Sequence, residues 1–148
     1  MNMVDGDRPP PQLAQYPGFL LNWVAARARM RFAAALAEQD LHLREFAALT
    51  IVATRPGLTQ QDLAAASEID ASTLVATLDA LERRGLAERR VLPEDRRKRA
   101  IYLTTEGEAA LRRGRALAMR IGNELFGTLT AAERRQFELL LRKLAGVG

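Results

Sequence analysis

The sequence has no cysteine and, among its 148 residues, a single histidine, His42. Without cysteine the chain cannot form disulfide bonds, zinc–thiolate sites or a thiol that senses oxidants. One histidine leaves at most a metal site built from carboxylates, and no nucleophile, base and metal ligands converge in the sequence. We therefore expect no enzymatic activity, no catalytic residues, no metal and no cofactor.

Long apolar runs are also missing. No window approaches 18 uncharged apolar residues, which argues against a membrane-spanning helix and against a membrane partner. Residues 1–13 combine acidic side chains with three prolines, whereas a secretion signal needs a basic start and an apolar stretch. The expected localisation is cytoplasmic.

Enough apolar residues are present to build a folded domain. They make up 48% of the chain, and the formal net charge is only +4, a combination that excludes a wholly disordered protein. A chain of this length buries roughly two thirds of its unfolded surface. We predict a flexible arm over residues 1–12 and a single domain over residues 13–148.

Apolar spacing and local stop signals predict the helices. Residues 17–37 and 43–54 have helical periodicity, and the Arg-Pro-Gly tripeptide at 55–57 ends the second helix. A capping box at Thr59 opens a short helix to about residue 66, and a four-residue turn leads to Asp70, which caps the next helix. Leu74, Leu78 and Leu81 line the inner face of that helix with Val75 beside them, and the helix ends at Gly85.

The periodicity then changes to that of strands. Residues 86–92 and 99–104 read as a hairpin whose loop is the charged segment 93–98. Two further capping boxes, at Thr105 and Thr130, begin the last two helices. The fold class is therefore mainly α with a small β-hairpin wing, and its central order of helix, turn, helix and hairpin is that of a winged helix-turn-helix.

The helix after Asp70 is the candidate recognition helix. If its leucines face the core, small side chains face outward near its first turn, where such helices contact the major groove. An alternative is that the hydroxyls there only cap free amides of the first turn. The predicted DNA contacts on the helical part are Gln60, Ser72, Thr73, Ala76 and Thr77.

The hairpin carries the densest positive charge of the chain. Residues 89–99 contain six basic residues against two acidic ones, in a sequence whose isoelectric point is 10.3. A thin hairpin tip can enter the minor groove, where arginine reads groove width, while other cations neutralise phosphates. The alternative is a solvated charged turn. The predicted contacts of the wing are Asp95, Arg96, Arg97 and Lys98.

Several motifs resemble those of the MarR family of bacterial transcriptional regulators, and the likeness extends from about residue 19 to residue 144. The segments that carry it are LREFAAL at 43–49, GLTQQDLA at 57–64, IDASTLV at 69–75, LDALERRGL at 78–86, PEDRR at 93–97 and LTxxG at 103–107.

This resemblance implies an obligate dimer that represses transcription at a palindromic operator and releases it when a small, often anionic aromatic compound binds. Residues 43–104 would form the DNA-binding lobe, and helices within 17–37 and 105–146 would form the dimerisation region. By the same resemblance, Asp95 would position Arg97 in the minor groove. The cysteine-based oxidant sensing of one branch of the family is excluded here.

Apolar residues of the terminal helices independently favour a dimer, because they exceed what a small winged helix needs for its own core. The alternative is that they complete the core of one subunit. The residues concerned are Phe19, Trp23, Phe137, Leu140, Leu141 and Leu144.

Trp23 and Arg27 stand four residues apart on one helix face, where an aromatic wall beside a guanidinium suits an aromatic carboxylate. His42 is a candidate for lining the same space. Alternatively, Trp23 belongs to the dimer core, Arg27 faces solvent and His42 is a surface or capping residue. Two other functions stay open: a DNA-binding protein without an effector, constitutive or architectural, and a winged-helix module that binds an acidic protein.

Overall fold

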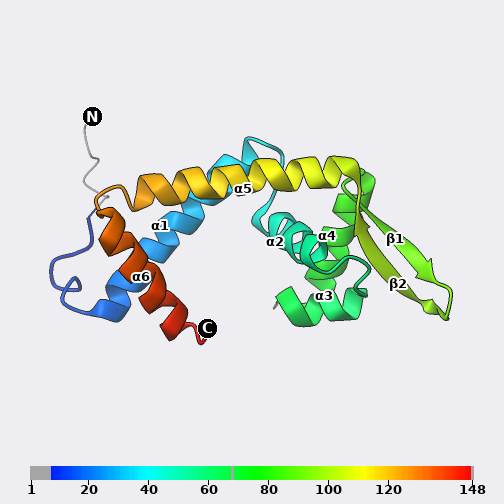
Figure 1. Ribbon diagram of the computed structural model, residues 1–148, viewed down its shortest axis with the longest axis horizontal. Coiled ribbons are helices and arrows are strands. Elements are labelled where there is room, and N and C mark those ends of the chain that lie inside the picture. The colour runs from blue at the N-terminus through cyan, green and yellow to red at the C-terminus, as the bar shows by residue number, and fades with distance from the viewer. Residues whose placement is uncertain (1–7, 68, 148) are drawn as a thin grey trace. The chain divides into compact units, whose positions relative to one another are not determined.

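A computed structural model describes residues 8–67 and 69–147 of the chain (Figure 1). The described residues form six helices and one antiparallel hairpin. In chain order these are α1 (Pro17–Ala37), α2 (Leu43–Thr54), α3 (Gln60–Ser67), α4 (Ala71–Arg83), β1 (Ala87–Leu92), β2 (Asp95–Leu103), α5 (Thr105–Leu125) and α6 (Ala131–Leu144). The predicted fold class is confirmed.

Most helix boundaries follow the local signals in the sequence. α1 and α2 have the predicted bounds, and α3 extends one residue further than expected, to Ser67. The Thr130 hydroxyl oxygen accepts the N–H of Glu133 at 3.3 Å, which completes the predicted capping box of α6. The predicted cap of α5 is wrong by one residue. The hydroxyl oxygen of Thr104, rather than Thr105, accepts the N–H of Gly107 at 3.0 Å, because Thr105 is already helical.

The hairpin differs most from the prediction. Only Pro93 and Glu94 separate the two strands, so the expected six-residue loop is wrong and Asp95 already belongs to β2. Leu92 pairs with Asp95, whereas the preceding Val91 pairs with Arg99, so residues 96–98 lie outside the regular register. The charged segment is therefore a bulged strand end rather than an open loop.

A third extended segment, which the sequence analysis missed, joins the base of the wing. Thr59 forms an isolated bridge with Ala100. The N–H of Gly57 donates to the carbonyl of Ile101 at 2.9 Å, and the N–H of Ile101 donates to the carbonyl of Leu58 at 3.0 Å. These bonds attach the hairpin directly to the segment that leads into α3.

Contacts divide the chain into two compact units. The winged unit comprises residues 32–117, and the terminal unit comprises residues 1–31 and 118–148, of which residues 8–31 and 118–147 are described. Helices α1 and α5 contribute to both. The expectation of one domain over residues 13–148 stays a prediction, and residues 1–7 of the predicted flexible arm lie outside the described residues.

The core lies in the winged unit. Its fully buried large side chains come from α1 to α4 and β2, and they are Leu36, Leu49, Leu63, Leu74, Leu78, Leu81 and Ile101. The start of α5 packs closely on this core, because a Cβ atom on Gly107 would lie 1.8 Å from the carbonyl oxygen of Leu86. Among the described residues of the terminal unit, only Ile121 is buried. No helix in residues 8–67 or 69–147 is long and apolar enough to cross a bilayer.

Candidate nucleic-acid interface

Capping carboxylates fix the starts of both helices of the helix-turn-helix. At α3, the Thr59 hydroxyl donates to Asp62 at 2.7 Å, and this bond is the main reason why the pKa of Asp62 lies below its usual value. At α4, Asp70 accepts the Ser72 hydroxyl at 2.6 Å and the N–H of Thr73 at 2.9 Å. The Ser72 bond first, and then the Thr73 bonds, hold the pKa of Asp70 well below its usual range.

An ionised carboxylate therefore occupies the N-terminus of α4. The positive end of a helix dipole attracts one anion, and here the protein supplies it from Asp70. A DNA phosphate at this end of α4 would therefore meet a negative charge rather than free amides. Readout by α4 depends on the side chains along its outer face.

The outer face of α4 corrects one predicted contact. Ser72 and Ala76 are exposed as predicted, and Thr73 is half-buried. Thr77, however, is only 8% exposed, and its hydroxyl donates to the carbonyl of Thr73 at 2.8 Å. Its predicted outward orientation is wrong, because this local bond satisfies the hydroxyl and lets the methyl group pack with the core.

Val75 takes the outward position instead. The sequence analysis placed it beside the buried leucines of α4, but its side chain is 38% exposed. Both positions differ from the prediction, because a threonine whose hydroxyl is satisfied can be buried and a valine can face solvent. The helical spacing from Ser72 was the better signal, since residues three and four positions later share its face.

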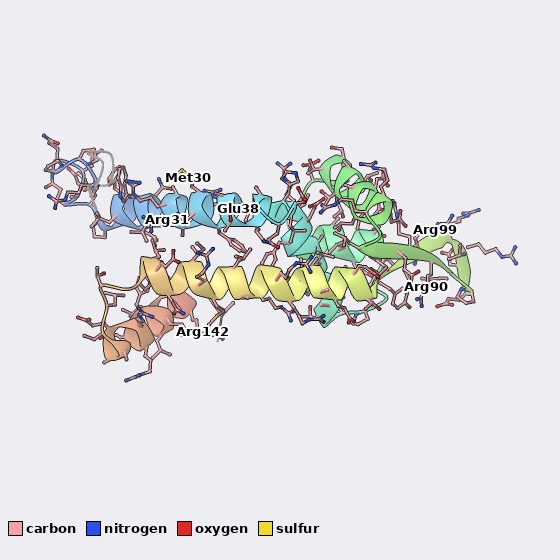
Figure 2. The ribbon with its side chains drawn as sticks, turned by 90° about the horizontal axis from the view of Figure 1, so that it is seen from above. Met30, Arg31, Glu38, Arg90, Arg99 and Arg142 are labelled. Carbon is pink, nitrogen blue, oxygen red and sulfur yellow. The ribbon has the colours of Figure 1, made fainter. Side chains whose placement is uncertain are left out.

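The wing presents a continuous run of cations. Residues 96–99 are all exposed, and Figure 2 shows Arg99 on the hairpin together with Arg90. Asp95 is half-buried, and its Oδ1 accepts the backbone N–H of Arg97 at 3.0 Å. The carboxylate thus holds the backbone that carries the Arg97 side chain, which leaves the guanidinium at the exposed strand end.

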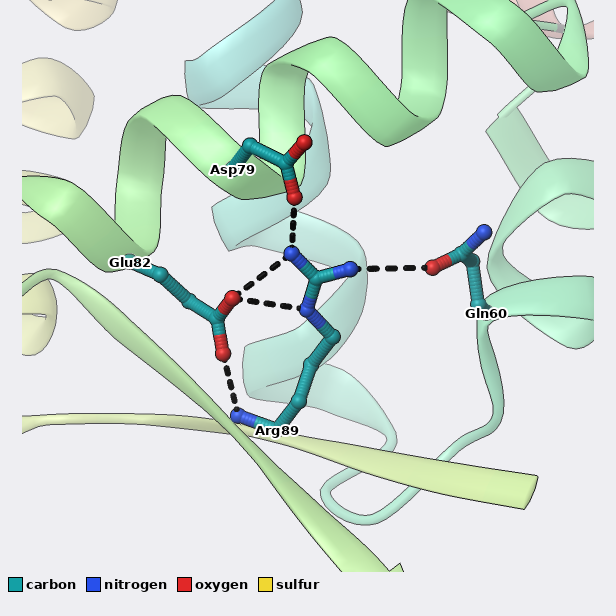
Figure 3. A network of polar contacts seen from close by, with 4 residues as sticks. All are labelled: Gln60, Asp79, Glu82 and Arg89. Carbon is teal, nitrogen blue, oxygen red and sulfur yellow. Dashed lines mark hydrogen bonds and ion pairs between the residues drawn. The ribbon is translucent and has the colours of Figure 1, made fainter. Parts of the chain in front are cut away.

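Arg89 has a different role from the other cations of the predicted cluster. Its Nε donates to Glu82 at 2.8 Å, its backbone N–H donates to the same carboxylate at 2.9 Å, and its guanidinium also pairs with Asp79 (Figure 3). The hydrogen bond with Glu82 is the main cause that raises the pKa of Arg89. Arg89 therefore ties β1 to the outer face of α4.

The same network reaches α3. Arg89 Nη1 lies 3.4 Å from Oε1 of Gln60, a half-buried residue predicted to contact DNA. Gln60 therefore helps to hold α3 beside the wing, and its predicted contact with DNA stays a prediction. This network was not predicted, because spacing along the chain does not show that β1 returns beside α4.

Arg90 is also engaged within the wing. It pairs with Glu88, and its guanidinium carbon lies 4.4 Å from the centre of the Tyr102 ring. Six cations were predicted to form one cluster. Arg89 and Arg90 pair with carboxylates, so the exposed cations at 96–99 are the ones that can contact a partner. Among the described residues, no three potential metal ligands gather into one site.

In the terminal unit, Arg27 stacks on Trp23. The guanidinium carbon lies 4.4 Å from the indole centre, and the Phe19 ring stacks on the same indole at 6.0 Å between ring centres. Both Trp23 and Arg27 are half-buried. His42 belongs to the winged unit, where it precedes α2, is exposed and donates its backbone N–H to Glu45 at 2.9 Å. That His42 and Trp23 line one space stays a prediction.

An apolar groove of about 520 Å³ lies between α1 and α6 of the terminal unit. Several of its side chains are well exposed, with Leu144 at 78%, Leu140 at 51% and Leu21 at 47%. The lining residues are Pro17, Gly18, Leu20, Leu21, Val24, Phe137, Leu140, Leu141 and Leu144. We call this surface the terminal groove.

The helix-turn-helix, the paired hairpin and its exposed cations define a winged helix-turn-helix protein of the DNA-binding class. A family model described as the MarR family matches residues 41–98. The chain is 33% identical over 105 residues to the transcriptional regulator HosA of Escherichia coli, which is 71% of this chain and 78% of HosA. It is 31% identical over 127 residues to the transcriptional repressor Rv2887 of Mycobacterium tuberculosis, covering 86% of this chain and 91% of that protein.

The chain belongs to the MarR family, and it is a DNA-binding transcriptional regulator rather than an enzyme. With a regulatory protein for the hcr operon of Thauera aromatica it shares 36% identity over 96 residues, which span 65% of this chain and 58% of that protein.

Solved structures agree with this assignment. The apo form of MarR from E. coli has a TM-score of 0.79 at 28% identity, covering 87% of this chain and 96% of that one. Rv2887 in complex with DNA has a TM-score of 0.77 at 30% identity, covering 87% and 97%. Rv2887 has also been solved with p-aminosalicylic acid, with a TM-score of 0.74 at 29% identity over 88% and 98%.

Proposed function

We propose that the protein is a dimeric repressor that binds a palindromic operator and is released by a small anionic aromatic ligand. The observation that carries the DNA-binding part is the pairing of an exposed α4 face with the exposed cations at 96–99 in one compact unit. Phosphate contacts from the wing supply affinity, and α4 supplies sequence preference. Because its target is the chromosome, we place the protein in the cytoplasm.

The terminal groove supports the dimer. Exposed leucines on α1 and α6 cost free energy in water, and a second copy of the chain would cover them. A two-fold dimer presents two identical winged units, which explains why its operator would be an inverted repeat.

Selection of bound duplexes from a random pool tests this function. We expect an inverted repeat whose half-site centres lie about 10 bp apart, one helical turn, on one face of the duplex. Affinity should fall steeply as salt rises. Enrichment of a single asymmetric half-site by a monomer would contradict the dimeric repressor. Recovery of no DNA above background would favour the alternative of a module that binds an acidic protein.

The stacked pair of Trp23 and Arg27 supports the ligand part. An aromatic acid can stack with the indole and accept a charge-assisted hydrogen bond from the guanidinium. The related repressor Rv2887 forms a complex with p-aminosalicylic acid, which has this chemistry. Release requires that the ligand bind the DNA-incompetent arrangement more tightly than the DNA-bound one.

Tryptophan fluorescence tests the ligand, because Trp23 is the only tryptophan. We expect salicylate-like acids to change its emission saturably, with a dissociation constant that Arg27→Ala raises at least about tenfold by removing the partner of the anion. Arg29→Ala, which removes an exposed arginine two positions along α1, is the matched control and should leave the constant unchanged.

The same titration should weaken operator binding, and added operator should raise its midpoint through linkage. A set of aromatic acids that neither alters the emission nor releases DNA would overturn the ligand proposal in favour of an effector-free regulator. Saturable binding of an acid without release of the operator would show a binding site that does not control DNA binding. This result would also contradict the ligand proposal.

A further inference from the structure

The outer face of α4 has an unusual composition for a helix that reads DNA. Its exposed side chains in the first two turns are Ala71, Ser72, Val75 and Ala76. The most frequent base-specific contacts use arginine or lysine on guanine and asparagine or glutamine on adenine. None of these four residue types occurs in α4 before Arg83, its last residue.

The hydroxyl protons of Ser72 and Thr77 are already used within the protein. Ser72 donates its proton to Asp70, and Thr77 donates to the carbonyl of Thr73. The two carboxylates further along α4 are also occupied, because Asp79 and Glu82 both pair with Arg89. Hydrogen bonds from these side chains to base edges, whether donated by the hydroxyls or accepted by the carboxylates, therefore contribute little to base recognition by this helix.

The methyl groups of Val75 and Ala76 remain as the means by which this face can distinguish bases. Val75 is 38% exposed, Ala76 lies beside it, and both are short enough for the helix to approach the floor of the groove closely. In the major groove, the C5-methyl group of thymine is the apolar feature that differs between base pairs. An apolar side chain that meets this methyl removes both surfaces from water.

We propose that Val75 and Ala76 read thymine through its C5-methyl group, so that each operator half-site presents thymine methyls under the first two turns of α4. This inference rests on the proposed operator binding and adds the chemistry by which the operator is chosen. Val75 is then a specificity-determining residue, although the sequence alone placed it beside the inward-facing leucines of α4. The phosphate contacts of the wing add affinity without reading thymine methyls.

Deoxyuridine substitution tests the inference, because deoxyuridine keeps the pairing edge of thymidine and lacks only the methyl group. Each thymine of the selected operator is replaced in turn, symmetrically in both half-sites, and the dissociation constant is measured by fluorescence anisotropy. We expect affinity to fall about fourfold for each contacted methyl, from the transfer free energy of one carbon group. Thymines outside the half-sites are the internal control.

A variant assigns the effect to α4. In Val75→Ala the difference between the thymine and deoxyuridine operators should shrink at the position that Val75 contacts, whereas Val147→Ala should retain the full difference. Val147 is 53% exposed and lies beyond α6, so it controls for removal of an exposed valine.

Three results would overturn the inference alone. The selected half-sites could lack thymine, or deoxyuridine could leave every dissociation constant within twofold, and in both cases operator binding itself would stand. Equal deoxyuridine effects in Val75→Ala and the wild type at every position would show that Val75 contacts no thymine methyl, which contradicts the proposal. Selection of no preferred sequence would instead overturn operator binding, and this inference with it.

Discussion

Replacing Leu140 and Leu144 together by glutamate should turn the protein into a monomer and lower its affinity for a palindromic operator at least about 100-fold. Both side chains line the terminal groove and are 51% and 78% exposed in the protomer, so the change places charges on a surface that the second copy would cover. A monomer binds one half-site at a time and lacks the high effective concentration of the second winged unit.

Leu139→Glu is the matched control for this variant. Leu139 lies on the same helix and is 68% exposed, but it does not line the terminal groove. Sedimentation equilibrium gives the oligomeric state, fluorescence anisotropy gives operator affinity, and far-ultraviolet circular dichroism checks that both variants fold. A double glutamate variant that stays dimeric would remove the terminal groove from the interface, and a monomeric variant with unchanged operator affinity would refute binding as a dimer.

Replacing Arg96 and Arg97 together by alanine should weaken operator binding at least about tenfold. The slope of log affinity against log salt should also become shallower, by about 1 for each phosphate that the variant no longer neutralises. Both side chains are exposed at the strand end beyond the regular register, so the fold should survive. The weakening should be similar for operator variants with different bases under α4, because binding to phosphates carries no direct sequence information.

A double variant on α5, Arg112→Ala with Arg113→Ala, controls for the change in net charge. Both residues are exposed on the first half of α5, and Figure 1 shows that part of the winged unit on the opposite side from α3. Its operator affinity should stay close to that of the wild type. If the wing variant retains full affinity across a salt series, the wing takes no part in DNA binding.

Local signals in the sequence were sufficient for most helix boundaries. Asp70 and Thr130 begin their helices as predicted because a capping bond involves residues only three positions apart. The tripeptide at 55–57 ends α2 for an equally local reason, since a proline followed by a glycine at φ 80° cannot continue a helix. Thr104 and Thr105 show the limit of such signals. Two adjacent threonines can each cap a helix, and the sequence alone did not show that Thr104 caps α5.

Two elements of the candidate site required the tertiary structure. The charged segment from Asp95 to Lys98 looked like a loop, but Asp95 pairs with Leu92 of β1, so that β2 begins at Asp95. Arg89 looked like part of a free cationic cluster, but the return of β1 alongside α4 brings it to Asp79 and Glu82. Neither partner can be found from spacing along the chain alone.

The sequence by itself determined the class of fold, the order of its elements and the charge of the wing, because capping, periodicity and strand propensity act over a few neighbouring residues. The leucine face of α4 was predicted correctly, and only the tertiary structure decided the edge of that face, where Thr77 is buried and Val75 lies on the outer surface. The physical reason is that burial of one side chain depends on what packs against it and on whether its polar atoms find partners, and both depend on segments distant in the sequence.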